Sequence, residues 1–371
     1  SVIDLDDQRV YEHVYHDGRW AGIFQATQRG AQQFFMQGKP RSIIDIATLT
    51  SIYRPGPLDA GVHKIYLDSK ANPDKIDYQH PLIEKVLKTT SNCIIFQEQV
   101  MALCNVVAGF PQEDCDTVRR TIMKRSASKA DGMKKQAQDL KDRFVEGAVG
   151  NGVDRQLADD LYEKILFFSG YGFNASHAVS YAIDSYYCAW LLTYYEEEWL
   201  CAYLESMSGN PDKRKKAFGE VKKLGYAIVP IDINYATSGW TILEGKRFMP
   251  SFNSCKGVGD AAIEEITANR PYRSIDDLLW DEEGKWRHSK FNKKAMEALI
   301  KIKAFDSMDL VGPGKMFSSY KAMHDIVIEK NAEIKKWTKK DPDRGRNRFK
   351  ELTVEMADEP EWSLSVFAVF S

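Results

Sequence analysis

Two short stretches of this sequence carry side chains that could bind phosphate or a nucleotide. The first, 118–143, reads VRRTIMKRSASKADGMKKQAQDLKDR and holds nine lysines or arginines against three aspartates, in a chain whose net charge is −2. Arg119, Arg120 and Lys124 fall near one side of a helix. Arginine forks and a lysine point charge suit a triphosphate or a nucleic-acid strand. A solvated basic helix face explains the same pattern, so both interpretations stay open.

The second stretch, GYGFNASH at 170–177, combines two glycines, two aromatic rings, an amide, a hydroxyl and an imidazole. It lacks the lysine and the spacing of a P-loop, and a lone Gly-x-Gly is not a dinucleotide fingerprint. Ser176 and His177 are not expected to form a nucleophile–base pair, because sequence neighbours seldom face each other and no orienting acid is evident. As structure, the glycines end one helix, and Asn174 or Ser176 caps the next.

A third pattern begins at Lys256 and reads KGVGDAAIEEI. It is typical of a helix-hairpin-helix, whose glycines free backbone N–H groups to bind a DNA phosphate without reading the bases. A similar turn and helix at 288–308 indicates a weak internal duplication. Seven lysines or arginines against one glutamate between 285 and 303 are consistent with a phosphate-facing surface. The predicted DNA-binding residues are Lys256, Gly257, Gly259, Lys290, Lys293 and Lys294.

The sequence contains no recognisable pattern of metal ligands. The seven histidines are dispersed without a zinc-binding spacing. No pair of aspartates lies on an evident strand, as a two-metal phosphoryl-transfer site would require. We therefore predict no metal site in this chain, and any nucleotide transfer would need carboxylates supplied from elsewhere.

The elements that position these motifs are predicted to be mainly α-helical. Leu157, Leu161, Ile165 and Phe168 recur at helical spacing, and the prolines and glycine of 54–57 fix a turn. The composition changes soon after 230–234, and the duplicated pattern lies in a unit from 252 to 308. The glycine- and proline-rich 311–314 follows as a predicted linker. We expect a helical domain over 1–245, a tandem helix-hairpin-helix domain over 246–310, and a charged helical linker with a truncated tail over 311–371.

The overall composition narrows the class of protein. The chain has 371 residues, of which 43% are hydrophobic and 28% charged, as in ordinary globular proteins. Six dispersed cysteines without a CxxC pair are typical of reduced thiols in the cytoplasm. The apolar stretch 178–207 is predicted to be a buried core helix, since Asp184 and the acidic run 196–198 are costly in lipid. No secretion signal is evident, and we expect no membrane contact.

Seven motifs in this order resemble the fingers region of the bacterial C-family replicative polymerases, the DNA polymerase III alpha subunits. They are GIFQ (22–25), YRPGPLDAG (53–61), IIFQEQVM (94–101), AGFPQEDCDTVRR (108–120), EGAVGNGV (146–153), GYGFNASHAVSYA (170–182) and VPIDIN (229–234). The family's tandem helix-hairpin-helix follows its fingers, where KGVGDAAIEEI appears in this chain. The resemblance implies a helical polymerase fingers domain over 1–245.

The resemblance also implies an activity. The family extends a primer by attack of its 3′-hydroxyl on an incoming dNTP, with two Mg²⁺ ions held by palm aspartates. By this resemblance Arg119, Arg120 and Lys124 hold the triphosphate and neutralise the leaving pyrophosphate. Tyr171, Phe173 and Asn174 would lie by the nascent base pair. His177 and Arg54 would line the same pocket.

The sequence departs from the family pattern at several points. The palm precedes the segment that 3–7 resembles, so its aspartates are expected on another chain or segment. The family's methionine-glycine-lysine-lysine run is Met123-Lys124-Arg125 here, and its usual lysine after Asn174 is Ala175. The isolated chain is expected to be inactive in DNA synthesis.

Three hypotheses follow for the chain: half of a split polymerase, as in a phage; one product of an interrupted gene; or a non-catalytic helix-hairpin-helix DNA-binding module. The polymerase hypotheses imply primer–template DNA, dNTP and a palm-bearing chain as partners, in the cytoplasm at a nucleoid or phage replication site. A sliding clamp is a further candidate partner, with only a faint motif at 364–370.

Overall fold

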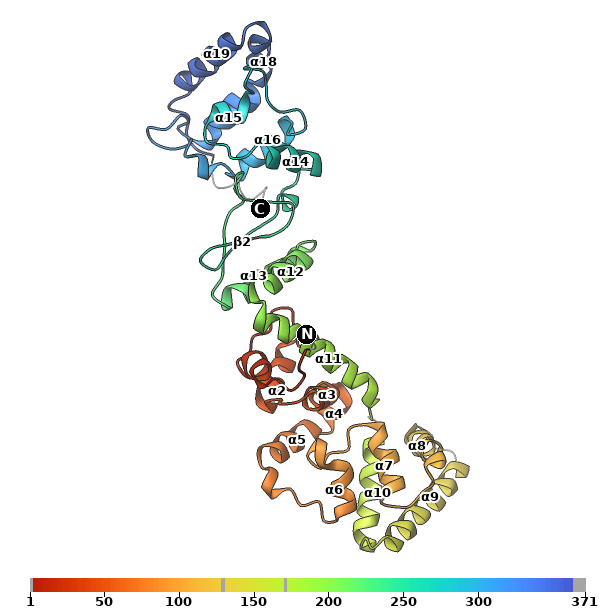
Figure 1. Ribbon diagram of the computed structural model, residues 1–371. Coiled ribbons are helices and arrows are strands. Elements are labelled where there is room, and N and C mark those ends of the chain that lie inside the picture. The colour runs from red at the N-terminus through yellow and green to blue at the C-terminus, as the bar shows by residue number, and fades with distance from the viewer. Residues whose placement is uncertain (1–2, 128–130, 170–171, 363–371) are drawn as a thin grey trace. The chain divides into compact units, whose positions relative to one another are not determined.

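The computed structural model describes residues 3–127, 131–169 and 172–362 (Figure 1). Two compact units form along the chain, the first unit over residues 1–196 and the second unit over 197–371. Helices make up most of both units, and the strands of the described residues are few and short. The predicted mainly α fold is therefore confirmed. The predicted domain boundaries at 245 and 310 stay predictions.

The N-terminal part of the first unit is a helical layer built around α11 (Ala175–Tyr194). Helix α11 packs on α3 (Ile43–Ile52) and on α1 (Gln8–Val10) with the following π-helix η1 (Tyr11–His16). The buried Tyr15 and Ser185 hydroxyls share a hydrogen bond of 2.8 Å, which joins η1 to α11. Helix α2 (Arg29–Gly38) completes this layer by packing against η1 and α3.

The stretch 178–207 is not one buried helix, as we expected, but parts of two. Helix α11 ends at Tyr194, and α12 (Glu196–Met207) starts after Tyr195. Only one side of α11 is buried, while Tyr187 and Tyr194 on the other side are exposed. In the part of the chain that the structure describes, no helix combines the length and apolar character that a membrane span requires.

The turn predicted at 54–57 starts a helix. Arg54 is the extended N-cap of α4 (Pro55–Asp59), and Pro55 occupies the first helical position, where a missing N–H costs nothing. The chain continues through α5 (Val62–Ala71), the 3₁₀ turn η2 (Pro73–Lys75), α6 (Pro81–Leu87) and the 3₁₀ turn η3 (Lys88–Thr90).

Four longer helices form a second layer of the first unit: α7 (Gln97–Val106), α8 (Gln112–Ala127), α9 (Asp131–Gly150) and α10 (Arg155–Ser169). Phe144 of α9 is fully buried between the rings of Phe110 and Tyr162, at 6.4 and 5.4 Å. Leu161 and Ile165 of α10 are buried in the same core, as their helical spacing predicts. Buried side chains of α7 and α8 belong to the same core, which holds these two helices in place. Helix α8 carries Arg119 and Arg120 of the first candidate motif.

The second unit begins with α12 and α13 (Pro211–Lys223), followed by a small sheet. Its strands are β1 (Ala227–Ile228), β2 (Thr241–Leu243) and β3 (Arg247–Met249), in the order β1-β3-β2. Strand β1 is parallel to β3, with Ala227 opposite Arg247, and β2 is antiparallel to β3, with Ile242 opposite Phe248.

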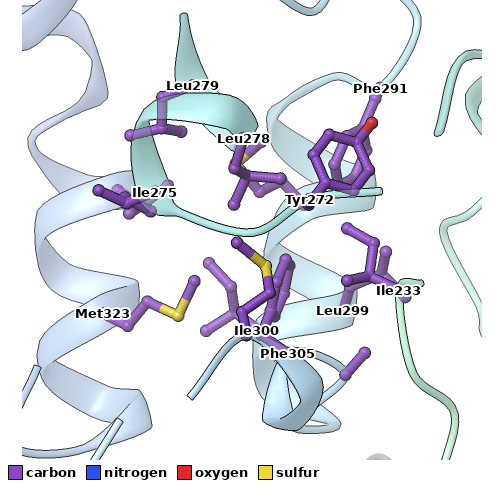
Figure 2. Close-up of a cluster of buried hydrophobic side chains, with 14 of the residues drawn as sticks. Ile233, Tyr272, Ile275, Leu278, Leu279, Phe291, Leu299, Ile300, Phe305 and Met323 are labelled. Atoms are coloured by element: carbon purple, nitrogen blue, oxygen red, sulfur yellow. The ribbon is translucent and has the colours of Figure 1, made fainter. Parts of the chain in front are cut away.

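The helices after the sheet are short and share one core. They are α14 (Asp260–Ala268), α15 (Ile275–Leu279), α16 (Lys293–Lys301), α17 (Tyr320–His324), α18 (Asn331–Lys340) and α19 (Pro342–Glu355), with 3₁₀ turns η4 (Phe252–Ser254) and η5 (Asp306–Met308) and the π-helix η6 (Asp325–Glu329). Figure 2 shows Leu299 and Ile300 of α16 in one cluster of buried side chains with Ile275 of α15 and Met323 of α17.

The segment 311–371, expected to be a charged linker and tail, contributes helices to this core as far as residue 355. Phe317, Met323 and Phe349 are buried in it beside the hairpin side chains. The segment's charged residues lie on the outer faces of helices whose inner faces are apolar, and composition alone does not separate the two faces.

Helices α18 and α19 form a tight hairpin joined through a single residue. Asp341 caps α19 by accepting a hydrogen bond from the N–H of Asp343, and its own N–H donates to the Trp337 carbonyl. The two helices approach closely at Gly345, where a β-carbon would lie 2.8 Å from the Cα of Thr338. A side chain at residue 345 would therefore push the helices apart.

We expect Gly345→Ala to lower the free energy of unfolding of the second unit by about 1–3 kcal/mol through overpacking. Gly219→Ala on α13 is the matched control, because nothing lies within 4 Å of its added carbon. The control should gain about 0.5–1 kcal/mol from better helix propensity. Urea unfolding followed by tryptophan fluorescence measures both, since six of the eight tryptophans lie in 197–371. Equal effects of the two substitutions would contradict the close approach.

Candidate functional site

The segment before α11 is bound to the start of α7. The N–H of Phe173 donates to the Ile95 carbonyl at 3.1 Å, and the N–H of Gln97 donates to the Phe173 carbonyl at 2.9 Å. The Gln97 side chain adds a third bond, from Nε2 to the Gly172 carbonyl at 2.9 Å. Residues 172–173 of the GYGFN motif are thus fixed by backbone and side-chain bonds to a segment 75 residues earlier.

The same Gln97 side chain contacts the basic helix α8. Its Oε1 accepts a hydrogen bond from Nη1 of Arg119 at 2.9 Å. Nε and Nη2 of Arg119 donate to Asp116 Oδ1 at 3.0 and 2.7 Å. With 16% of its side chain exposed, Arg119 is held between Asp116 and Gln97. Gln97 therefore joins the two motifs that the sequence offers as phosphate and base contacts.

Arg120 is placed differently from Arg119, although the sequence presents them as a pair. Its side chain is 68% exposed, and its Nε lies 2.7 Å from Asp116 Oδ2. The hydrogen bond from Arg119, together with the charge of both arginines, lowers the pKa of the Asp116 carboxyl from its ordinary value. The Arg120 guanidinium is consequently open to solvent, while Arg119 is largely enclosed by its partners.

The Phe173 ring lies between a cationic side chain and further aromatic rings. The guanidinium carbon of Arg54 lies 4.3 Å from the centre of the Phe173 ring, a cation–π contact. Phe173 and His177 have ring centres 5.5 Å apart, and His177 and Tyr181 have ring centres 4.1 Å apart. Arg54 also lines a cleft of about 390 Å³ together with Gln25, Thr27 and Tyr53. Flat rings beside a cation can hold a base and its sugar.

Asn174 acts as the helix cap that the sequence allowed. Its Oδ1 accepts from the N–H of His177 at 2.8 Å, so Asn174 rather than Ser176 is the N-cap of α11. The Asn174 side chain also donates to Glu98 Oε1 at 2.9 Å, and the N–H of Ala175 donates to Glu98 Oε2 at 2.8 Å. A carboxylate at this position stabilises the positive end of the helix.

Sequence reasoning missed the roles of Gln97 and Glu98. Both lie in the IIFQEQVM motif, which marked the family resemblance, but no role was assigned to either residue. Gln97 bonds Arg119, 22 residues later, and both residues bond the segment before α11, 75 to 77 residues later. Only a signal for pairing between these distant segments could have identified them. Two predicted residues are not placed: Tyr171 lies outside the described residues, and so does the side chain of Lys124 on α8.

The first hairpin in the second unit has the backbone that its glycines predict. Gly257 has a φ of +107°, a conformation that glycine adopts readily. A β-carbon there would lie 3.6 Å from Cβ of Ala298 and 3.7 Å from side-chain carbons of Lys294, both on α16. Gly259 starts α14 without any side-chain cap, and Lys256 is exposed beside it. The turn therefore presents backbone N–H groups next to lysines.

The second hairpin is attached to the first through Glu265 of α14. Glu265 accepts hydrogen bonds from the backbone N–H of Ser289, at 3.0 Å, and of Phe291. Asn292 then caps α16 by accepting from the N–H of Ala295 at 3.2 Å. Lys290, Lys293 and Lys294 are all exposed around this helix start. With Gly257 against Lys294, the structure brings the predicted DNA-binding residues of both hairpins into one region of the second unit.

No three histidine, cysteine, aspartate or glutamate side chains are grouped as a metal site would require, within the residues that the structure describes. Asp116, the carboxylate nearest the candidate phosphate contacts, is already paired with two arginines.

We expect Glu98→Ala to weaken the start of α11 by about 1–2 kcal/mol, because two hydrogen bonds and a favourable charge at the helix N-terminus are lost. Hydrogen exchange of the amides at 174–178 should then be about 5–30-fold faster. Glu113→Ala is a control, since this exposed glutamate of α8 also lies in the first turn of its helix. If exchange at 174–178 is the same in both variants, Glu98 does not stabilise this helix start.

Two regions of the chain match known protein families. Residues 1–152 match the bacterial DNA polymerase III alpha subunit finger domain, and residues 225–311 match a helix-hairpin-helix motif. The chain is 35% identical over 342 residues to the DNA polymerase III subunit alpha of Campylobacter jejuni, covering 91% of this chain and 27% of that protein. It is 35% identical over 305 residues to the Aquifex aeolicus protein of the same name, covering 82% and 25%.

The chain thus spans about a quarter of the length of the curated relatives it matches. The finger-domain match covers Arg54, α7 and α8 of the first candidate site, and the second match covers both hairpins. The segment 170–177 lies between the two matched regions. From these matches, the chain carries the finger domain of the DNA polymerase III alpha subunit family, followed by a helix-hairpin-helix region.

Proposed function

We propose that this chain binds an incoming dNTP through its first unit and primer–template DNA through its second unit, during template-directed DNA synthesis. The observation that carries the proposal is the Gln97 side chain, which joins Arg119 of α8 to the backbone of Gly172 before α11. This side chain thereby holds the arginines of α8 close to the segment that carries the Phe173 ring.

Within this site the proposal divides the dNTP among named residues. Arg120 binds the triphosphate. Arg119 bonds both Asp116 and Gln97, and Asp116 in turn pairs with Arg120, so Arg119 helps to hold Arg120 at the site. Phe173, Arg54 and His177 contact the base and sugar, because Arg54 and His177 both lie beside the Phe173 ring. Asn174 positions this helix start, and Lys124 and Tyr171 keep the triphosphate and base-pair roles that the resemblance implies.

In the second unit, the proposal assigns the duplex to the two hairpins. The uncapped start of α14 at Gly259 supplies backbone N–H groups that suit a phosphate. Lys256, Lys290, Lys293 and Lys294 add exposed positive charge around it. Contacts of this kind bind the DNA backbone and do not distinguish sequences.

The reaction itself needs two Mg²⁺ ions, which stabilise the attacking and leaving oxygens in such transfers. We propose that a palm supplied by another chain or segment holds them. The pure chain should then extend no primer when supplied with dNTPs and Mg²⁺. Extension by the pure chain, abolished by a chelator, would contradict this part of the proposal. An accessory DNA-binding module is the second candidate function, and it predicts DNA binding without dNTP binding.

Replacing Arg120 tests the nucleotide site. Arg120→Ala should raise the Kd for a fluorescent dATP analogue about tenfold, or ~1.4 kcal/mol, because a charge-assisted phosphate contact is lost. Arg155→Ala is the matched control, since Arg155 is also exposed, at 62%, and paired with one carboxylate. Fluorescence anisotropy with competing pyrophosphate measures the phosphate contribution. Equal effects of the two variants, or no nucleotide binding, would favour the accessory-module function.

Neutralising the hairpin lysines tests the DNA site. The triple variant K256Q/K293Q/K294Q should bind duplex DNA more weakly for every sequence tested, because phosphate contacts carry no sequence information. The slope of log Kobs against log salt should fall in magnitude by about 2–3, near 0.9 for each lost contact. If the loss of affinity depends on the DNA sequence, or if the salt slope is unchanged, these lysines do not contact the DNA backbone.

A further inference from the structure

Helix α18 carries four lysines on one side, at positions that neither hairpin includes. They are Lys335, Lys336, Lys339 and Lys340, which we call the lysine face. Lys335 and Lys339 are four residues apart, as are Lys336 and Lys340, so each pair lies along the helix with like charges adjacent. The opposite side of the helix is buried through Asn331, Ile334 and Thr338. The charges are therefore concentrated on the part of α18 that faces away from the core.

Arg348 of this helical hairpin and the lysine face differ in their partners. Arg348 of α19 is neutralised internally, with nitrogens 2.7 to 3.0 Å from carboxylate oxygens of Glu333, Glu351 and Glu355. The lysine face has no such partners, since none of its four ammonium groups forms an ion pair within the residues described here. The carboxylates of this hairpin thus neutralise Arg348 and not the lysine face, whose four lysines keep a combined charge of +4.

Two lysines of this face are supported by aromatic rings. The Lys335 ammonium lies 4.5 Å from the centre of the Trp286 ring, and the Lys340 ammonium lies 5.2 Å from the centre of the Trp337 ring. Burial, and secondarily the charge of Lys339, lower the pKa of Lys335 from its ordinary value. The repulsion among these lysines is therefore present in the folded chain, and a bound anion would relieve it.

Helix stability explains only part of this arrangement. Lysines in the last turn interact favourably with the helix dipole, which accounts for Lys339 and Lys340. Lys335 and Lys336 lie before the last turn, where the dipole effect is weak. Each like-charge pair four residues apart costs a few tenths of a kcal/mol in an isolated helix. The concentration of four unpaired lysines is thus not a requirement of the fold.

We propose that the lysine face binds the phosphodiester backbone of DNA, as a contact surface additional to the two hairpins. Residues four apart on a helix are displaced by about 6 Å along its axis, so the charges form a row rather than a single-anion pocket. A row of flexible point charges suits successive phosphates and requires no sequence. The rigid α18–α19 hairpin, closed at Gly345, holds this row in place. The inference rests on the proposed function, in which the same unit binds duplex DNA.

The test uses the full chain and a duplex of arbitrary sequence. The variant K336Q/K339Q/K340Q removes three exposed charges and leaves Lys335 packed on Trp286. We expect DNA affinity about tenfold lower or more at ~0.1 M salt, and a salt slope smaller in magnitude by about 2–3. The charge-preserving variant K336R/K339R/K340R should keep the affinity of the unmodified chain. Circular dichroism and thermal unfolding verify that all variants fold.

The outcomes separate this inference from the proposed function. If the glutamine variant keeps both affinity and salt slope while the hairpin variant loses them, the lysine face does not bind DNA and the proposed function stands. Equal loss in the arginine and glutamine variants would also overturn the inference, because positive charge would then not be the cause. If the unmodified chain binds no duplex, both the inference and the proposed DNA-binding function fail.

Discussion

The candidate nucleotide site depends on the hydrogen bonds of one amide side chain. Gln97 donates from Nε2 to the Gly172 carbonyl and accepts at Oε1 from Arg119, while its backbone N–H bonds the Phe173 carbonyl. An amide is suited to this position because it is donor and acceptor at once. A carboxylate could not donate to Gly172, and a lysine could not accept from Arg119. The relation between α8 and the start of α11 therefore depends on this residue type.

Burial distinguishes the cations that are held inside this chain from those that stay accessible to solvent. A cation that is largely withdrawn from water needs a partner, as Arg119 has in Asp116 and Gln97. Arg348 follows the same rule with its three carboxylates. Arg120 is also paired with Asp116, but its side chain is 68% exposed, and most of the lysine face is exposed as well. Arginine and lysine thus occur in this chain both as buried cations with internal partners and as exposed cations, and the degree of burial distinguishes the two.

The hairpin region obtains its arrangement from close packing. Gly257 leaves only van der Waals distance to Ala298 and Lys294, so the first turn can lie directly on α16. Glu265 then accepts from the backbone of Ser289 and Phe291, which fixes the start of the second hairpin. Buried side chains from 317, 323 and 349 cover the other side of the same core. The apolar part of the charged C-terminal segment is therefore what supports the hairpins.

The sequence by itself determined the features that depend on local spacing. Helical periodicity predicts the mainly α fold, and the Gly-x-Gly turn predicts the hairpin backbone at Gly257. A short polar side chain before an apolar run predicts a helix cap at Asn174 or Ser176, of which the structure uses Asn174. Only the tertiary structure decided the long-range choices. It joined Gln97 and Glu98 to residues about 75 positions later, separated Arg119 from Arg120, and packed the segment after 311 into a core. The reason is physical: caps and turns are satisfied within a few residues, whereas pairing and burial depend on which distant segments the fold brings into contact.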